Sequence, residues 1–239
     1  MLEVRKSADR GVGKLDWLDA RFTFQFGPYK NPDQVGFSDL RLLNDDQVKG
    51  GGGFAEHEHK DTEVFSYVLS GELAHKDSLG EGSVVRPGDV ITMSTGSGIT
   101  HSEFNNSKAD GVHFLQIWMS AHEKGGPPSY GQQHFPDVEK RGRLRLIISP
   151  DGGGGSLRFR NDSKIYAGLF DGPERAELAL GPDRYAYVHV IRGAISLNGT
   201  PLTDGDGVRV RQESRLVFSD GRDAEVLVFD MRPLEVPEA

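Results

Sequence analysis

The sequence predicts an all-β protein made of two β-barrels of jelly-roll type that pack together. The 239 residues include 31 glycines and 12 prolines, which suits many short turns better than long helices. The second half of the chain also repeats a pattern of the first, because residues 67–73 (YVLSGEL) align with residues 189–195 (HVIRGAI). An internal repeat of this length indicates two copies of one structural unit.

Strands of the first half follow from alternating or continuous apolar patterns bounded by turn residues. Residues 44–46 (NDD) are expected to form the turn that ends the second strand, with Asn44 and Asp46 either supporting a site or lying in solvent. Residues 111–119 are apolar on both faces, which predicts a strand buried on both sides. The strands expected in chain order are residues 21–26, 38–46, 53–59, 63–69, 98–105 and 111–119, and residues 84–91 form a Pro-Gly-Asp turn that leads into another strand.

The second half begins with a connection over residues 121–145, which is rich in glycine and proline and makes a poor strand. A strand follows at residues 144–148, and residues 151–156 (DGGGGS) are read as a surface turn. Residues 204–208 and 226–231 then repeat features of the first half. We therefore expect an N-terminal domain over residues 1–125 and a C-terminal domain over residues 126–239.

Charge and composition exclude several classes of function. The net charge is −8, and no basic run marks a nucleic-acid surface. Cysteine is absent, which excludes disulfides and thiolate catalysis. The first residues lack the apolar segment of a signal peptide and no run suits a membrane span, so a cytoplasmic protein without membrane contact is expected.

The chemistry of the chain is expected where two pairs of metal-binding residue types occur. His57 and His59 are two residues apart, as are His101 and Glu103. Side chains at positions i and i+2 of a strand point to the same face, so each pair can face inward together. Three imidazoles and one carboxylate around one point suit a first-row divalent ion. Four protein ligands leave open positions, which favours catalysis over a closed structural site.

The residues around the predicted metal site can also be assigned roles. Glu103 is a candidate general base as well as a ligand, because a carboxylate can leave the ion and accept a proton. Glu63 is the alternative carboxylate ligand. His75 and His113 lie on neighbouring strands and are expected beside the ligands or in the core. Phe24, Phe54 and Trp118 offer apolar faces to a flat ligand, although aromatic residues at strand spacing are more often core.

These motifs resemble a known family. The spacing of the histidines, the Pro-Gly-Asp turn at residues 87–89 and the later histidine resemble the two cupin motifs. Residues 59–63 (HKDTE), 75–80 (HKDSLG) and 96–103 (GSGITHSE) are similar to those of the pirin family. The resemblance implies a bicupin fold. It also implies that His57, His59, His101 and Glu103 bind the metal, with Glu63 outside the ligand set.

The resemblance also implies a reaction. Pirins similar to this chain are associated with quercetin 2,3-dioxygenase activity, in which a flavonol reacts with O2 and releases carbon monoxide. The metal expected first is Fe(II), with Ni, Co, Cu, Mn or Zn as alternatives. Another implied function is a non-enzymatic, metal-containing regulator that responds to redox state and binds a protein partner. No sequence feature marks a surface for that partner.

The second copy lacks the metal-binding residue types. The counterparts of the histidine pairs fall near residues 178–181 (LALG) and residues 216–218 (LVF). His189 is a lone histidine in an apolar strand and aligns with Tyr67, so it is read as a hydrogen-bonded core residue. The sequence therefore predicts one metal per chain, bound in the N-terminal domain.

Overall fold

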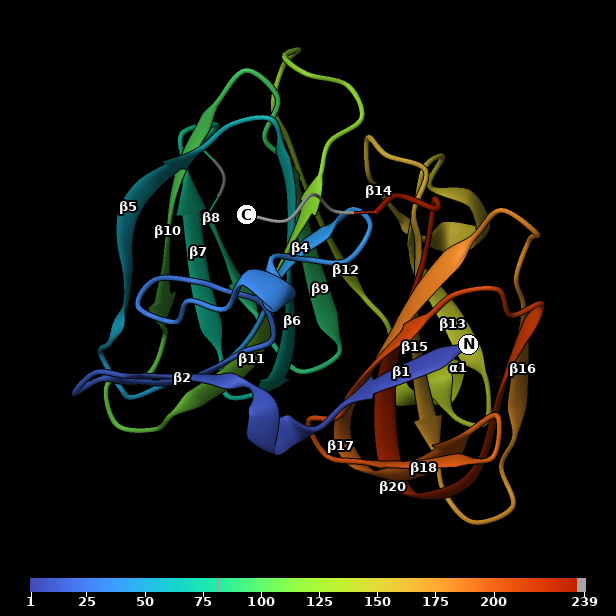
Figure 1. The fold of residues 1–239 in the computed structure, drawn as a ribbon. Coiled ribbons are helices and arrows are strands. Elements are labelled where there is room, and N and C mark those ends of the chain that lie inside the picture. The colour runs from blue at the N-terminus through green and yellow to red at the C-terminus, as the bar shows by residue number, and fades with distance from the viewer. Residues whose placement is uncertain (81, 236–239) are drawn as a thin grey trace. The chain divides into compact units, whose positions relative to one another are not determined.

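The computed structural model describes residues 1–80 and 82–235 and consists mainly of β-strands joined by short turns (Figure 1). The α-helix α1 spans only Asp137–Lys140, and three short 3₁₀ helices lie at Ser7–Asp9, Pro32–Gln34 and Gly153–Gly155. No helix in the described part of the chain is long and apolar enough to cross a membrane. The prediction of an all-β chain is confirmed.

The described residues form two compact units. The first unit contains Gly11–His134 and Leu157–Asn161, and the second contains Met1–Arg10, Phe135–Ser156 and Asp162–Glu235. The sequence predicted a single boundary between residues 125 and 126, whereas each unit in the structure contains separate segments of the chain. Residues 1–10 join the second unit because their strand pairs there, and residues 126–134 join the first unit for the same reason. Residues 236–239 of the expected C-terminal domain lie outside the described residues.

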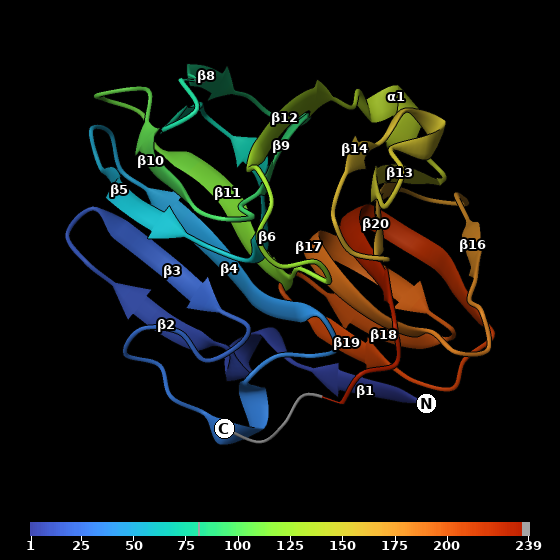
Figure 2. The same cartoon turned by 90° about the horizontal axis from the view of Figure 1, so that it is seen from above.

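The first unit consists of two antiparallel sheets. One has the strand order β5-β10-β7-β8 and the other the order β12-β9-β6-β11-β4-β3-β2. Figure 2 shows β2, β3, β4 and β11 side by side in the larger sheet. The bounds are β2 Gly11–Lys14, β3 Leu18–Phe22, β4 Leu40–Val48, β5 Gly53–His59, β6 Thr62–Ser70, β7 Leu73–Asp77, β8 Gly82–Val85, β9 Asp89–Ser94, β10 Ile99–Asn105, β11 Val112–Ser120 and β12 Ser129–His134.

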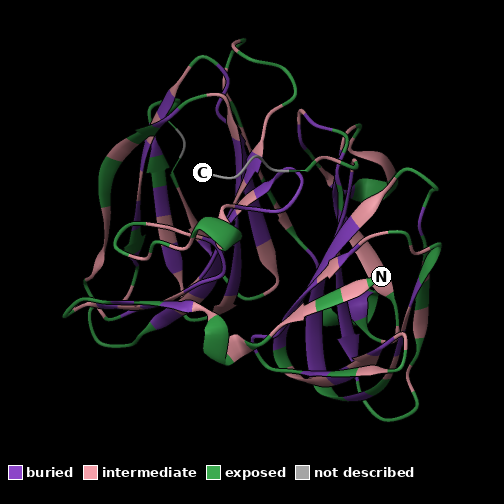
Figure 3. Ribbon diagram, in the orientation of Figure 1, coloured by how far each residue is buried: buried purple, intermediate pink, exposed green. Residues whose placement is uncertain are grey.

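The central strands of the larger sheet are buried on both faces, as Figure 3 shows for β6 and β11. One face packs into an apolar core that includes Phe22, Val68 and Phe114. On the other face, the Phe65 ring lies 5.9 Å from the ring of Phe159. The prediction that residues 111–119 form a doubly buried strand is confirmed.

Three local predictions were wrong. The early strand β3 ends at Phe22, so residues 23–26 continue outside it. Residues 44–46 lie within β4 because β3 and β11 pair with them on both sides. Residues 129–134 form strand β12 in the segment predicted to lack strands. Pairing with β9 needs only backbone groups, so the polar side chains of β12 remain at the surface.

The second unit has the strand order β1-β19-β17-β20-β15-β13, with β16 paired to β20 and β18 paired to β17. Its long strand β20 contains Asp220 and Asp223 with positive φ (55° and 45°), where its pairing partners change. The bounds are β1 Leu2–Arg5, β13 Leu144–Ser149, β15 Lys164–Phe170, β16 Ala176–Ala179, β17 Tyr185–Leu197, β18 Thr200–Thr203, β19 Gly207–Val210 and β20 Arg215–Met231; β14, Leu157–Arg158, belongs to the first unit.

The first strand of the chain is fixed to the second unit by a buried carboxylate. β1 pairs with β19, and Figure 1 shows it in blue among the orange and red strands. After β1, Lys6 Nζ and the Ser7 backbone N–H donate to Asp206, each at 2.9 Å. The Thr203 backbone N–H donates to the same carboxylate at 3.0 Å. Asp206 therefore joins the N-terminal segment to the turn before β19.

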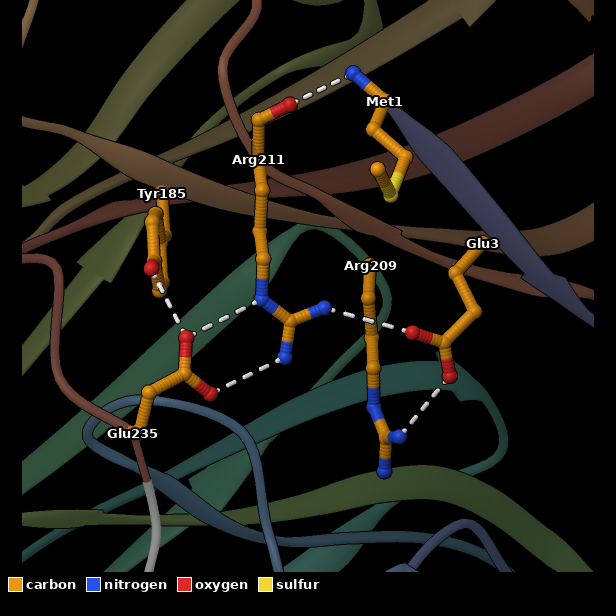
Figure 4. A network of polar contacts seen from close by, with 6 residues as sticks. All are labelled: Met1, Glu3, Tyr185, Arg209, Arg211 and Glu235. Atoms are coloured by element: carbon orange, nitrogen blue, oxygen red, sulfur yellow. Dashed lines mark hydrogen bonds and ion pairs between the residues drawn. The ribbon is translucent and has the colours of Figure 1, made fainter.

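A more exposed polar network surrounds the other end of β1 (Figure 4). Glu3 forms ion pairs with Arg209 and Arg211 at 3.0 and 3.2 Å, and Arg211 also contacts Glu235. The Tyr185 hydroxyl donates to Glu235 at 2.7 Å. Exposed ion pairs each contribute about 0–1 kcal/mol, so the buried Asp206 is the stronger attachment.

Replacing Asp206 with alanine should destabilise the second unit by about 1.5–3 kcal/mol, the contribution of a hydrogen bond to a charged group, because its donors are only partly buried. Burial opposes ionisation of Asp206, but the hydrogen bonds from Lys6, Thr203 and Ser7 lower its pKa below 3.8. Its contribution is thus present above the unfolded-state pKa of about 3.9 and is lost as pH falls through the folded-state pKa.

Urea unfolding of the wild type and of Asp206→Ala at pH 7 and below pH 4 measures this contribution. The difference in unfolding free energy should shrink at the lower pH. A difference that stays constant across this range would contradict the assignment of an ionised, hydrogen-bonded Asp206.

Candidate metal centre

Strands β5 and β10 bring the predicted histidines together. The strands are antiparallel, and His57 stands directly opposite His101. His59 points to the same face as His57 because it lies two residues further along the strand. The ring centres lie 4.8 Å apart for His57–His59, 4.5 Å for His57–His101 and 5.0 Å for His59–His101. One ring nitrogen from each histidine lies within 4.8 Å of the other two.

The hydrogen bonds of these rings leave nitrogen atoms available. His57 Nδ1 lies 2.8 Å from the Ala55 carbonyl oxygen and donates to it, which places the lone pair on Nε2. His59 Nε2 and both ring nitrogens of His101 are buried without a hydrogen-bond partner. A buried polar atom without a partner costs about 1–3 kcal/mol, and a bound ion would remove that cost.

His59 and His101 are also in the protonation state that a metal requires. Burial, and then the neighbouring His57, lower the pKa of His59 to about 4. Burial and the surrounding histidines lower the pKa of His101 to about 2. Both rings are therefore neutral near pH 7, and a neutral imidazole is the form that binds a metal ion.

Glu103 shares the inward face of β10 with His101, because it lies two residues further along and the β10–β7 pairing is regular between them. The register with β5 shifts between His101 and Glu103, so that Glu103 stands opposite Phe54. Gln116 Nε2 donates to Glu103 Oε2 at 2.8 Å. Burial raises the pKa of Glu103 to about 7, although the hydrogen bonds from Ser66 and Gln116 act in the opposite direction.

The Ser66 hydroxyl has two acceptors within reach. Its Oγ lies 2.9 Å from Glu103 Oε1 and 2.6 Å from Gln116 Oε1. A hydroxyl has one proton to donate, so Ser66 can satisfy only one of these oxygens at a time. Glu103 Oε1 is thus the carboxylate atom whose hydrogen bonding can change without movement of the backbone.

Glu63 and His113 lie away from the histidine cluster. Glu63 is three residues from Ser66 on β6 and points to the opposite face, where Ser94 Oγ donates to it at 2.5 Å. The Arg160 backbone N–H donates to the same oxygen at 3.2 Å. His113 is half-exposed and bonded to Asp45 at 2.6 Å, on the face of β11 opposite to Gln116.

His75 and Asp46 do lie beside the cluster. His75 stands opposite Glu103 on the neighbouring strand β7. Asp46 is buried on β4, and burial, then Asp45 and Glu103, raise its pKa to about 8. Asn44 shares that face and is also buried. Of the aromatic candidates, Trp118 lies closest to the histidines, with its ring 4.7 Å from that of His59.

Sequence reasoning missed Ser66 and Gln116, the two hydrogen-bond partners of Glu103. Both are polar residues within otherwise apolar strands, and both are buried. That contrast was a usable signal, because a buried polar side chain needs a partner. Glu103 and Gln116 lie 37 and 50 residues from Ser66 along the chain, so a pattern within one strand does not reveal their contacts with it.

In the second unit, the residues that the sequence repeat aligns with the histidine pairs are apolar. Strands β16 and β20 of this unit pair antiparallel with Leu178 opposite Leu216, where the first unit has His57 opposite His101. Leu216 and Phe218 belong to a large apolar core with Leu178 packed against it. These residues offer no metal-binding atoms, in agreement with the sequence pattern.

Family models match both halves of the chain. Residues 4–119 match the model described as Pirin, and residues 146–231 match the model described as Quercetinase C-terminal cupin domain. The chain is 36% identical over 234 residues to the quercetin 2,3-dioxygenase of Escherichia coli (strain K12), covering 98% of this chain and 100% of that protein. It is 32% identical over 228 residues to the pirin-like protein of Caulobacter vibrioides, covering 95% and 98%.

A solved structure gives the same relationship. The crystal structure of the bacterial pirin YhhW from Escherichia coli, in complex with nickel(II), matches this chain with a TM-score of 0.93 at 36% sequence identity. The match covers 98% of this chain and 100% of that one. The two units described above are therefore cupin units of jelly-roll type.

Replacing His101 with alanine should remove the metal, because His101 takes part in both groups of candidate ligands in the first unit. Elemental analysis of the wild type should give about one ion per chain, and the variant almost none. The matched control is His189→Gln in the second unit, which should leave the metal content unchanged. Two ions per wild-type chain would contradict the prediction that only the first unit binds.

Glu103 and Glu63 should differ in their effect on metal binding. Glu103→Gln should weaken metal binding by at least about 100-fold, since loss of an outer partner alone already costs about 10–100-fold. Glu63→Gln should leave the affinity unchanged, because its side chain faces Ser94 and Arg160. Titration of the metal-free proteins with Ni²⁺ measures both. The opposite order of effects would reverse the assignment.

Proposed function

This chain belongs to the pirin family, and from that premise we propose that it is a metal-dependent dioxygenase that opens the heterocyclic ring of flavonols such as quercetin. The reaction consumes one O2 and yields a depside and carbon monoxide. The proposal is supported by the quercetin 2,3-dioxygenase of Escherichia coli, to which the chain is similar along 98% of its length.

The observation that carries the proposal is the cluster of three histidines, in which His59 and His101 are buried and have ring nitrogens without hydrogen-bond partners. We propose that His57, His59, His101 and Glu103 hold one divalent transition metal, Fe(II) being the first candidate and Ni(II) the ion bound in the similar pirin structure. Such an ion, when bound, supplies positive charge that favours a deprotonated hydroxyl and, if redox-active, electrons for O2 chemistry.

Glu103 is proposed to take the proton of the flavonol 3-hydroxyl. Burial raises the pKa of this carboxyl to about 7, which is suited to accepting a proton near neutral pH. Ser66 can turn its hydroxyl to Gln116 and leave Glu103 Oε1 free to receive the proton. The protonated oxygen can then donate to Ser66 Oγ. Gln116 Nε2 keeps the other carboxylate oxygen in place throughout.

Aromatic residues line one side of the cluster. The Trp118 ring meets the His59 ring edge to face at 4.7 Å, and Phe26 packs against Trp118 at 5.6 Å. A less aqueous surrounding strengthens the electrostatic interactions that favour a flavonolate. This wall also keeps the His59 ring in a fixed orientation.

The metal-loaded protein should therefore consume O2 in the presence of quercetin, bleach the flavonol absorbance and release carbon monoxide. An oxygen electrode, absorbance spectra and a carbon monoxide assay measure the three changes. Quercetin methylated at the 3-hydroxyl is the matched control and should not react, because it has no proton for Glu103 to remove. A metal-replete protein that leaves unmodified quercetin unchanged would contradict the proposed activity.

A further inference from the structure

A second group of metal-binding residue types lies next to the first. Ligand atoms of His75, His101 and Glu103 lie within 4.8 Å of one another, and all three residues are buried. They come from adjacent strands, because β7 and β10 pair with His75 opposite Glu103. His101 belongs to both groups, whereas His75 belongs only to the second.

His75 is held in the way that metal-binding histidines usually are. Its Nε2 donates to Asp77 Oδ2 at 2.9 Å, and both side chains are fully buried. Metal-binding histidines typically donate their second ring nitrogen to a carboxylate or a carbonyl in this way. The Tyr130 ring stacks on the His75 ring at 4.9 Å with an interplanar angle of 19°. These contacts fix both the position and the orientation of the ring.

The free nitrogen of His75 has no protein partner. Because Nε2 carries the proton given to Asp77, Nδ1 carries a lone pair in the neutral ring. Nδ1 is buried without a hydrogen-bond partner, as are both ring nitrogens of His101. Glu103 retains accepting capacity beyond its bonds to Ser66 and Gln116, because a carboxylate has about four lone-pair positions.

We propose that His75 Nδ1, His101 and Glu103 form a second position for a divalent transition metal inside the first unit. Two imidazoles and one carboxylate are the ligand set that suits non-haem Fe(II), with further positions open. The two positions share His101 and Glu103, so they are alternatives for a single ion. This inference rests on the proposed metal centre, and it is independent of whether flavonols are the substrates.

The test removes the ligands that belong only to the first position. The variant His57→Ala/His59→Ala should still bind about one Co²⁺ per chain, more weakly than the wild type. Adding His75→Ala should lower the remaining Co²⁺ affinity by more than about 100-fold, beyond the 10–100-fold cost of losing an outer partner. Adding His113→Ala instead is the matched control and should leave the affinity unchanged, because His113 faces Asp45 on the other side of the sheet. Calorimetry and the visible spectrum of Co²⁺ follow the binding.

Each result decides the proposal. A double variant that keeps the wild-type circular dichroism but binds no Co²⁺ would overturn it, as would a triple variant with His75→Ala that binds as tightly as the double variant. If that triple variant does not fold, X-ray absorption of the Co²⁺-loaded double variant counts the imidazole ligands of the ion. Two imidazoles are expected, and a single imidazole would overturn the proposal. A wild type that binds no Co²⁺ would refute both metal positions, whereas intact binding without quercetin turnover would refute only the proposed activity.

Discussion

The antiparallel pairing of β5 with β10 is the interaction on which the site depends. It places His57 opposite His101 and turns both toward the interior of the first unit. Burial in that interior keeps the His59 and His101 rings neutral, with pKa values of about 4 and 2, and leaves nitrogen atoms without partners. Such an arrangement is costly in a protein core unless another group satisfies those atoms. The strand pairing therefore creates a geometry in which a bound ion would satisfy those atoms.

The two units show how the same pairing can serve two purposes. In the second unit, β16 and β20 pair as β5 and β10 do, but Leu178 and Leu216 occupy the facing positions. These leucines extend an apolar core, which needs no ligand to be stable. The strand pairing is thus retained where the histidines are not. On the proposed function, a few side chains that face the interior of one unit would carry the chemistry.

Much of the fold and of the candidate site could be predicted from the sequence, because strand periodicity is a local pattern. The spacing of two residues was enough to group His57 with His59 and His101 with Glu103. The same rule, applied from Ser66, would have placed Glu63 on the opposite face. What could not be predicted depends on distant parts of the chain. Asn44–Asp46 resembled a turn, yet pairing on both sides keeps those residues in β4. Ser66 and Gln116 acquire their role only when three strands meet.

The central claim is that one transition metal lies in the first unit in contact with His101. A crystal structure of the protein purified without added metal, with anomalous scattering recorded at the Fe and Ni absorption edges, tests it most directly. The account predicts a single anomalous peak about 2.0–2.2 Å from a His101 ring nitrogen, as expected for a metal–imidazole bond. A peak in the second unit, or no peak beside His101, would contradict it.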